Sequence, residues 1–158
     1  GEYLEKIQYL RQVVPDIAIS TDVIVGFPGE TEAEFEETLK VIETVRFNPV
    51  YAFVYSERPG TRAAALDDDI PQQVKDERLQ QLLKVQNSIQ SELLDDLVGS
   101  SQEILIDGAH PRERRAMTGR SGGNTPYMIP DCDLEIGDMV SVKTCGRKTH
   151  SLIGELTR

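Results

Sequence analysis

The segment of residues 24–38, which reads IVGFPGETEAEFEET, constrains the fold more than any other part of this chain. An apolar strand runs into a turn with two glycines, and Gly26 and Gly29 allow a sharp bend or the close approach of a ligand. Thr31 and Glu34 then have the spacing of a capping box at a helix start. Because α/β sheets and barrels place ligands where a strand ends in such a turn, the segment predicts an α/β enzyme. A tight connection without a ligand fits the residues equally well.

Apolar periodicity along residues 1–70 predicts two helix–strand pairs. Apolar residues recur at helical spacing before Pro15 and again between residues 35 and 45. The runs 17–25 and 50–55 are rich in β-branched and aromatic residues, which predicts two buried strands. Alternating helices and strands indicate a parallel α/β sheet, in which the turns after both strands open at the same edge. Two strands are too few for a complete domain of this kind.

The rest of the chain predicts a long helix followed by a small β-barrel. The helix covers about residues 72–98, with apolar residues along one side and Gly99 at its C-cap position. Five short strands are then predicted, at residues 103–107, 117–120, 127–129, 139–144 and 151–156. Their number and spacing are typical of an OB-like barrel, a fold that often binds nucleic acid. The predicted domains are therefore residues 1–70, a connecting helix at 71–100, and a barrel at 101–158.

The acidic charge is confined to the first part of the chain. The formal net charge is −10, and residues 1–70 hold 14 Asp and Glu against six Lys and Arg, whereas residues 99–158 hold eight of each. This asymmetry predicts two units with different partners. Basic residues on the predicted barrel turns suit contacts to phosphates, although a merely solvated basic surface is an equal alternative. They are Arg112, Arg114, Arg115, Arg120, Arg147 and Lys148. Aromatic side chains for base stacking are sparse on this barrel, with only Tyr127 present.

The sequence shows no catalytic or metal-binding motif. Cys132 and Cys145 are too few for a disulfide framework and are expected to be reduced in the cytoplasm. Neither a CxxC nor an HExxH motif occurs, and His110 and His150 are interpreted as surface or turn residues. The apolar runs are too short to span a bilayer, and the first residues do not resemble a signal peptide.

Two motifs resemble the radical-SAM methylthiotransferases. They are residues 19–31, which read ISTDVIVGFPGET, and residues 55–64, which read YSERPGTRAA. The arginine–proline–glycine–threonine run at 58–61 favours the tRNA branch, the MiaB-type synthases of 2-methylthio-N6-isopentenyl-adenosine. The resemblance continues to the C-terminus through Pro71, Lys75, Arg78, Leu79, Gln86, Gly119, Arg120, Asn124, residues 136–137 and residues 151–156. It departs from the family at Gly122 and Gly123, which weakens the comparison for that loop.

The resemblance implies a fragment of a larger enzyme. Residues 1–70 would be the C-terminal portion of a radical-SAM partial α/β barrel, and residues 101–158 would be a TRAM domain that binds RNA. The full-length enzymes use S-adenosyl-L-methionine (SAM) and two 4Fe–4S clusters, whose cysteine motifs are absent here. This chain is therefore expected to be inactive alone and to bind no cluster. The residues carried over as SAM contacts are Ile24, Val25, Gly26, Tyr55 and Ser56. Glu30 is expected to shape the turn.

The function implied by the resemblance is methylthiolation of N6-isopentenyl-adenosine next to the anticodon. The implied partners are the tRNA anticodon stem-loop and the remaining N-terminal portion of the enzyme, in the cytoplasm and without a membrane. Self-association through unpaired strand edges is also expected. The alternatives are a non-catalytic RNA-binding module, or a related enzyme that acts on threonylcarbamoyl-adenosine or on a ribosomal protein.

Overall fold

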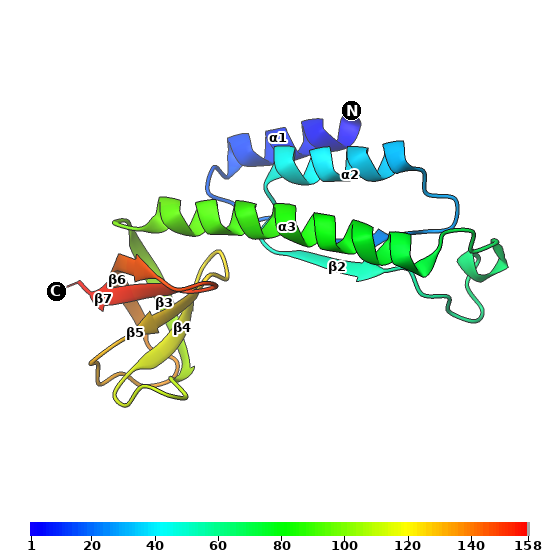
Figure 1. The fold of residues 1–158 in the computed structure, drawn as a ribbon. Coiled ribbons are helices and arrows are strands. Elements are labelled where there is room, and N and C mark those ends of the chain that lie inside the picture. Colours follow the sequence, from blue (N-terminus) through cyan, green and yellow to red (C-terminus); the bar gives the residue numbers. More distant parts are fainter. Residues whose placement is uncertain (158) are drawn as a thin grey trace. The chain divides into compact units, whose positions relative to one another are not determined.

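The computed structural model describes residues 1–157 and divides into two compact units, residues 1–89 and the residues from 90 onward. Helix α3 (Gln72–Leu97) begins in the first unit and ends in the second (Figure 1). The division falls inside this helix, whereas the sequence suggested a separate connecting segment at 71–100. The division into residues 1–70, 71–100 and 101–158 stays a prediction.

The first unit is a two-stranded parallel sheet with helices on one side. Its elements are α1 (Glu2–Val13), β1 (Thr21–Val25), α2 (Glu32–Val45), β2 (Val50–Val54), a 3-10 turn (Ala63–Ala65) and the first part of α3. The register runs from Thr21 opposite Val50 to Val25 opposite Val54, so both strands end at the same edge, as predicted. In Figure 1 the helices lie on the same side of β2. The apolar core of this unit includes Val25, Phe35, Ile42, Val45, Phe47 and Leu82.

The two strands are buried on one face only, whereas the sequence predicted two buried strands. Side chains alternate between the faces of a strand, and among the described residues helices cover just one of these faces. Val25 and Val50 are buried on the covered side. Ile24 and Phe53 are each 54% exposed on the other side. The first strand is also shorter than predicted, because it begins at Thr21 and not near residue 17.

The predicted capping box is present at the start of α2. The Glu34 backbone N–H donates to Thr31 Oγ1 at 3.3 Å, and the Thr31 backbone N–H donates to Glu34 Oε2 at 2.8 Å. The backbone N–H and the hydroxyl of Thr31 both donate to the Glu34 carboxylate, and these two bonds hold the pKa of Glu34 below its ordinary value. The strand–turn–helix predicted from residues 24–38 is therefore confirmed.

The second unit is a closed five-stranded barrel. Its strands are β3 (Ser101–Ala109), β4 (Met117–Ser121), β5 (Pro126–Ile129), β6 (Met139–Arg147) and β7 (Leu152–Leu156). The order is β3-β4-β5-β7-β6, and the pairing of β3 with β6 closes the barrel. Its core comprises Leu94 from α3 and, from the barrel, Ile104, Ile106, Tyr127, Ile129, Cys132, Val142 and Leu152. The predicted mixed α/β fold with a small OB-like barrel is confirmed.

Tyr127 is a core residue and not a platform for a base. It is 1% exposed, and its hydroxyl lies 2.9 Å from Thr144 Oγ1. Burial raises the pKa of the Tyr127 hydroxyl. The ring is therefore not available to stack on RNA, because it lies in the barrel core.

Within residues 1–157, no helix is both long and apolar enough to cross a membrane.

Candidate cofactor and RNA sites

The glycine turn after β1 is closed by the side chain of Glu30. Gly26 and Gly29 have φ values of 70° and 82°, in the left-handed region that favours glycine. The Glu30 backbone N–H donates to the Phe27 carbonyl at 2.8 Å. Glu30 Oε2 in turn accepts a hydrogen bond from the Gly26 N–H at 2.7 Å. Glu30 thus shapes the turn, as expected.

A backbone hydrogen bond joins the carboxyl ends of the two strands beside this turn. The Tyr55 backbone N–H donates to the Val25 carbonyl at 2.9 Å, one residue beyond the end of β2. The Tyr55 ring meets Phe27 edge to face, with their centroids 5.2 Å apart. The two motifs that carry the family resemblance therefore contact one another at the carboxyl edge of the sheet.

The five predicted SAM contacts are brought together, but their side chains face different ways. Ile24 and Ser56 are exposed, Val25 is buried on the helix-covered side, and Tyr55 is buried beside Phe27 and Lys75. A ligand on the open side of the sheet could reach Val25 only through backbone atoms. A Cβ at Gly26 would overlap the Lys75 side chain, so glycine is required there by packing within the protein. The assignment of all five residues to SAM stays a prediction.

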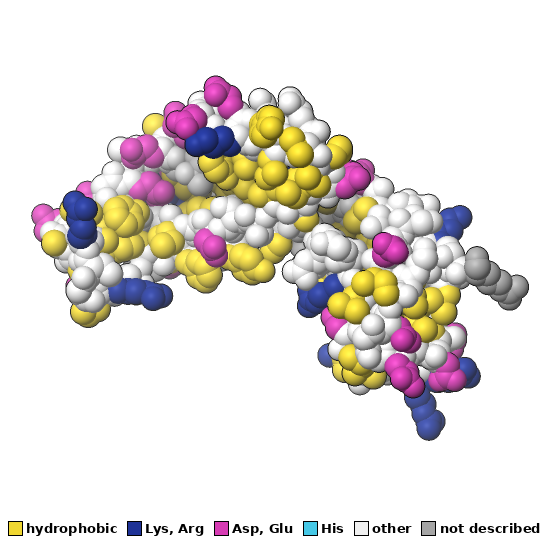
Figure 2. Space-filling view, turned by 180° about the vertical axis from the view of Figure 1, so that it is seen from behind, with side chains coloured by type: hydrophobic (Ala, Val, Ile, Leu, Met, Phe, Trp, Pro, Cys, Tyr) yellow, Lys and Arg dark blue, Asp and Glu magenta, His cyan; other side chains and the backbone are white. Residues whose placement is uncertain are grey.

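Sequence reasoning missed two aromatic residues on the same side as Ile24. In the register of the sheet, Asp22 lies opposite Tyr51 and Ile24 opposite Phe53. We call these four residues the open sheet face. Tyr51 is 50% exposed, and Figure 2 shows hydrophobic side chains along the margin of the first unit where Figure 1 places β2. The signal was in the sequence, because large Tyr51 and Phe53 alternate with smaller residues along β2.

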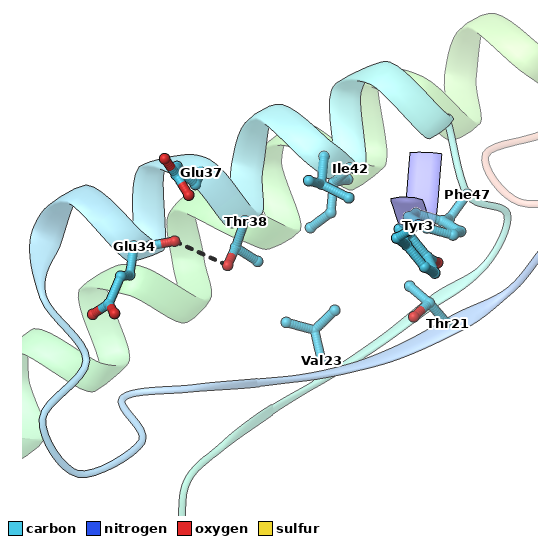
Figure 3. Close-up of a pocket in the computed structure, with 9 residues that line it drawn as sticks. Tyr3, Thr21, Val23, Glu34, Glu37, Thr38, Ile42 and Phe47 are labelled. Atoms are coloured by element: carbon cyan, nitrogen blue, oxygen red, sulfur yellow. Dashed lines mark hydrogen bonds between the residues drawn. The ribbon is translucent and has the colours of Figure 1, made fainter. Parts of the chain in front are cut away.

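A pocket of about 360 Å³ lies on the other side of β1. Thr21 and Val23 reach into it from the strand, and α2 forms its opposite wall (Figure 3). Thr38 Oγ1 donates to the Glu34 carbonyl at 3.1 Å on that wall. None of the predicted SAM contacts lines this pocket, so it belongs to the helix-covered side and not to the open sheet face.

The predicted RNA-binding residues of the barrel fall into two groups. Within residues 1–157, the guanidinium groups of Arg112, Arg114 and Arg115 make no hydrogen bond or ion pair, and all three are exposed in the β3–β4 loop. Arg120 Nε instead lies 3.2 Å from Asp107 Oδ2, and Arg147 Nε lies 2.6 Å from Asp95 Oδ1. The loop arginines can therefore meet a phosphate without first breaking an ion pair.

Among the predicted RNA-binding residues outside the β3–β4 loop, Lys148 is the one that contacts this loop. Its Nζ lies 2.9 Å from Glu113 Oε1, although 35 residues separate the two in sequence. The hydrogen bond from Lys148 lowers the pKa of Glu113. We call Arg112, Arg114, Arg115 and Lys148 the basic loop cluster, and its contact with RNA stays a prediction.

Among residues 1–157, no group of three or more His, Cys, Asp or Glu side chains comes together that could hold a metal ion. Cys132 is buried and Cys145 is exposed, and both are free. Both cysteines belong to the second unit.

The chain is similar over nearly its whole length to curated proteins named tRNA-2-methylthio-N(6)-dimethylallyladenosine synthase. It is 41% identical over 157 residues to the one from Acetivibrio thermocellus, which covers 99% of this chain and 33% of that protein. It is 44% identical to those from Thermoanaerobacter sp. (strain X514) and Xanthomonas euvesicatoria pv. vesicatoria, over 98% of this chain and 33% and 32% of theirs. The chain matches part of a tRNA methylthiotransferase. The resemblance predicted from the two motifs is confirmed.

The chain spans about a third of the length of these methylthiotransferases, as expected of a C-terminal fragment. No family model matches it. The matched region includes the glycine turn, the sheet edge and the barrel, because the alignments cover 98–99% of the chain.

Proposed function

We propose that this chain is the C-terminal part of a cytoplasmic enzyme that methylthiolates N6-isopentenyl-adenosine in tRNA. The observation that carries the proposal is the 38–44% identity, over almost the entire chain, to proteins named for that product. In this proposal the first unit supplies part of a radical-SAM barrel, and the second is a TRAM domain that binds the anticodon stem-loop. No observation favours a non-catalytic RNA-binding module instead.

The open sheet face fits the adenosyl part of SAM. Ile24 and Phe53 offer exposed apolar surface against which a purine can pack, and the Ser56 hydroxyl is exposed just beyond β2. The glycine turn allows the backbone to approach a ligand at the same edge. When bound, SAM and the iron–sulfur clusters supply the radical and methyl-transfer chemistry, whereas the residues of this chain bind and orient. The clusters are assigned to the rest of the enzyme.

The proposed activity is tested by expressing the full-length protein in a bacterial strain that lacks its own methylthiotransferase. We expect tRNA nucleosides from that strain to gain the 2-methylthio form of isopentenyl-adenosine, measured by mass spectrometry. Isopentenyl-adenosine that stays unmodified, while threonylcarbamoyl-adenosine or a ribosomal protein gains the methylthio group, would favour the related enzymes instead.

The basic loop cluster is expected to bind tRNA phosphates. In the full-length protein, replacing Arg112 and Arg114 by glutamine should weaken tRNA binding on the order of tenfold and reduce the slope of log K against log salt by about 1 to 2. The physical reason is that fewer phosphate contacts form in this variant, so fewer counterions are released when it binds tRNA. Binding is measured by fluorescence anisotropy with an anticodon stem-loop over a series of salt concentrations.

The matched control for this pair is the double change of Arg120 and Arg147 to glutamine. It removes the same two charges, but from side chains that already pair with Asp107 and Asp95. We expect a smaller loss of affinity and a smaller change in slope. Equal effects of the two double variants would mean that net charge, and not the arginine loop, governs binding.

A further inference from the structure

Two cations from α3 are buried against the glycine turn. Lys75 is 2% exposed and Arg78 is 6% exposed, and they lie three residues apart, on neighbouring positions of one helix face. Burying a charged side chain away from water costs several kcal/mol unless the charge is paired. The partners of Lys75 and Arg78 therefore indicate the structural role of these buried charges. Their partners lie on the turn, in the first part of α2, just after β2 and just before α3, all within the first unit.

Arg78 acts on the turn through Glu30. Its Nη1 donates to Glu30 Oε2 at 2.7 Å and to the Glu30 carbonyl at 3.0 Å, and its Nη2 donates to Glu32 Oε2 at 3.1 Å. The guanidinium also lies over the Phe35 ring, 5.4 Å from its centroid. The oxygen that Arg78 holds is the one that accepts the Gly26 N–H. Arg78, Glu30 and Gly26 therefore form one chain of charge-assisted contacts.

Lys75 contacts the same turn and the residue that follows β2. Its Nζ donates to both carboxylate oxygens of Asp68 at 2.6 Å and lies 5.3 Å from the centroid of the Tyr55 ring. Its aliphatic stem fills the space beside Gly26, where any Cβ would overlap it. The neighbouring Asp69 accepts the Gly29 N–H at 3.0 Å. Both glycines of the turn are thus fixed by groups that precede or begin α3.

We infer that Lys75 and Arg78 are positioning residues that hold the glycine turn in the single conformation needed to bind SAM. This inference rests on the proposed function, because it concerns the same cofactor site. Stability alone explains the arrangement poorly, since Arg78 Nε is buried without a partner among the described residues. An apolar side chain would avoid that cost. The ionic contacts instead specify where the turn lies, which an apolar contact does less well.

The test compares Arg78→Met with Gln86→Met in the full-length protein. Gln86 is a matched control because it also lies on α3 and is 6% exposed, but its Nε2 donates to the Phe47 carbonyl, away from the turn. Two readouts are taken, SAM affinity by calorimetry and amide hydrogen exchange of residues 24–31. We expect Arg78→Met to weaken SAM binding at least about tenfold and to speed exchange in this segment. Gln86→Met should change neither, although both variants lower the melting temperature.

Arg78→Lys keeps the charge but not the two-pronged geometry that reaches both Glu30 and Glu32. We expect its SAM affinity and its amide hydrogen exchange in residues 24–31 to lie between those of the wild type and of Arg78→Met. If Arg78→Met fails to fold, Arg78→Lys alone tests whether Arg78 positions the turn. Wild-type SAM affinity in Arg78→Lys together with wild-type exchange would overturn the inference, as would equal shifts in Arg78→Met and Gln86→Met. If the wild type itself binds no SAM, the proposed function fails, and the exchange measurement still tests whether Arg78 positions the turn.

Discussion

Replacing Ile24 by aspartate in the full-length protein is expected to weaken SAM binding by about 100-fold or more. Ile24 lies on the open sheet face beside Phe53, where the adenosyl group is proposed to pack. A carboxylate there would have to lose its hydration when the ligand covers it, at a cost of about 3 kcal/mol, which corresponds to that factor. SAM binding is measured by calorimetry, together with the yield of 2-methylthio nucleosides.

The control for this change is the same substitution at Ile136, which is 70% exposed in the second unit. Ile136→Asp introduces an identical carboxylate at a surface site far along the chain from the sheet, so SAM affinity should remain at the wild-type value. If Ile24→Asp also bound SAM with wild-type affinity, the open sheet face would not be the cofactor site.

Replacing Gly119 by alanine is expected to lower the free energy of unfolding of the barrel by about 2–3 kcal/mol, as in overpacked cores. Gly119 on β4 pairs with Ile106 on β3. An added Cβ would lie 2.5 Å from the Leu105 carbonyl oxygen and 2.6 Å from Ile104 Cγ2. Because one of these atoms is backbone, the strands themselves would have to move apart. The change is measured by urea unfolding followed by circular dichroism, and tRNA affinity should fall with it.

Gly122→Ala provides the comparison for Gly119→Ala. A Cβ at Gly122 would meet no atom within 4 Å, and its φ is outside the left-handed region. Its stability should stay within about 0.5 kcal/mol of the wild type, as for most surface changes. Equal stability of the two variants would show that the barrel tolerates a Cβ between β3 and β4.

Local signals in the sequence were sufficient wherever structure depends on near neighbours. The capping box of Thr31 and Glu34, the turn at Gly26 and Gly29 and the five barrel strands were all predicted from spacing and residue type. Each depends on hydrogen bonds or steric limits within a few residues, or on the period of apolar side chains. The family resemblance followed from the same turn, because it lies in one of the two most specific motifs of the chain.

The sequence failed where burial depended on which face other elements cover. Ile24 and Phe53 look like core residues by type, yet helices cover only the opposite side of the sheet in residues 1–157. Nor did the sequence indicate that the Tyr127 ring lies in the barrel core. The cause is the same for both strands and for Tyr127: composition fixes how apolar a strand is but not which of its faces finds a partner.

By itself, the sequence determined the strand–turn–helix of residues 24–38, the β-barrel and the relationship to tRNA methylthiotransferases. Only the tertiary structure decided that Arg78, 48 residues beyond Glu30, holds the turn through that carboxylate. It also decided that Lys148 forms an ion pair with Glu113 of the arginine loop. Arg120 and Arg147 instead form ion pairs with Asp107 and Asp95. The physical reason is that an ion pair forms between side chains that folding brings within about 4 Å, and sequence separation carries no information about that distance.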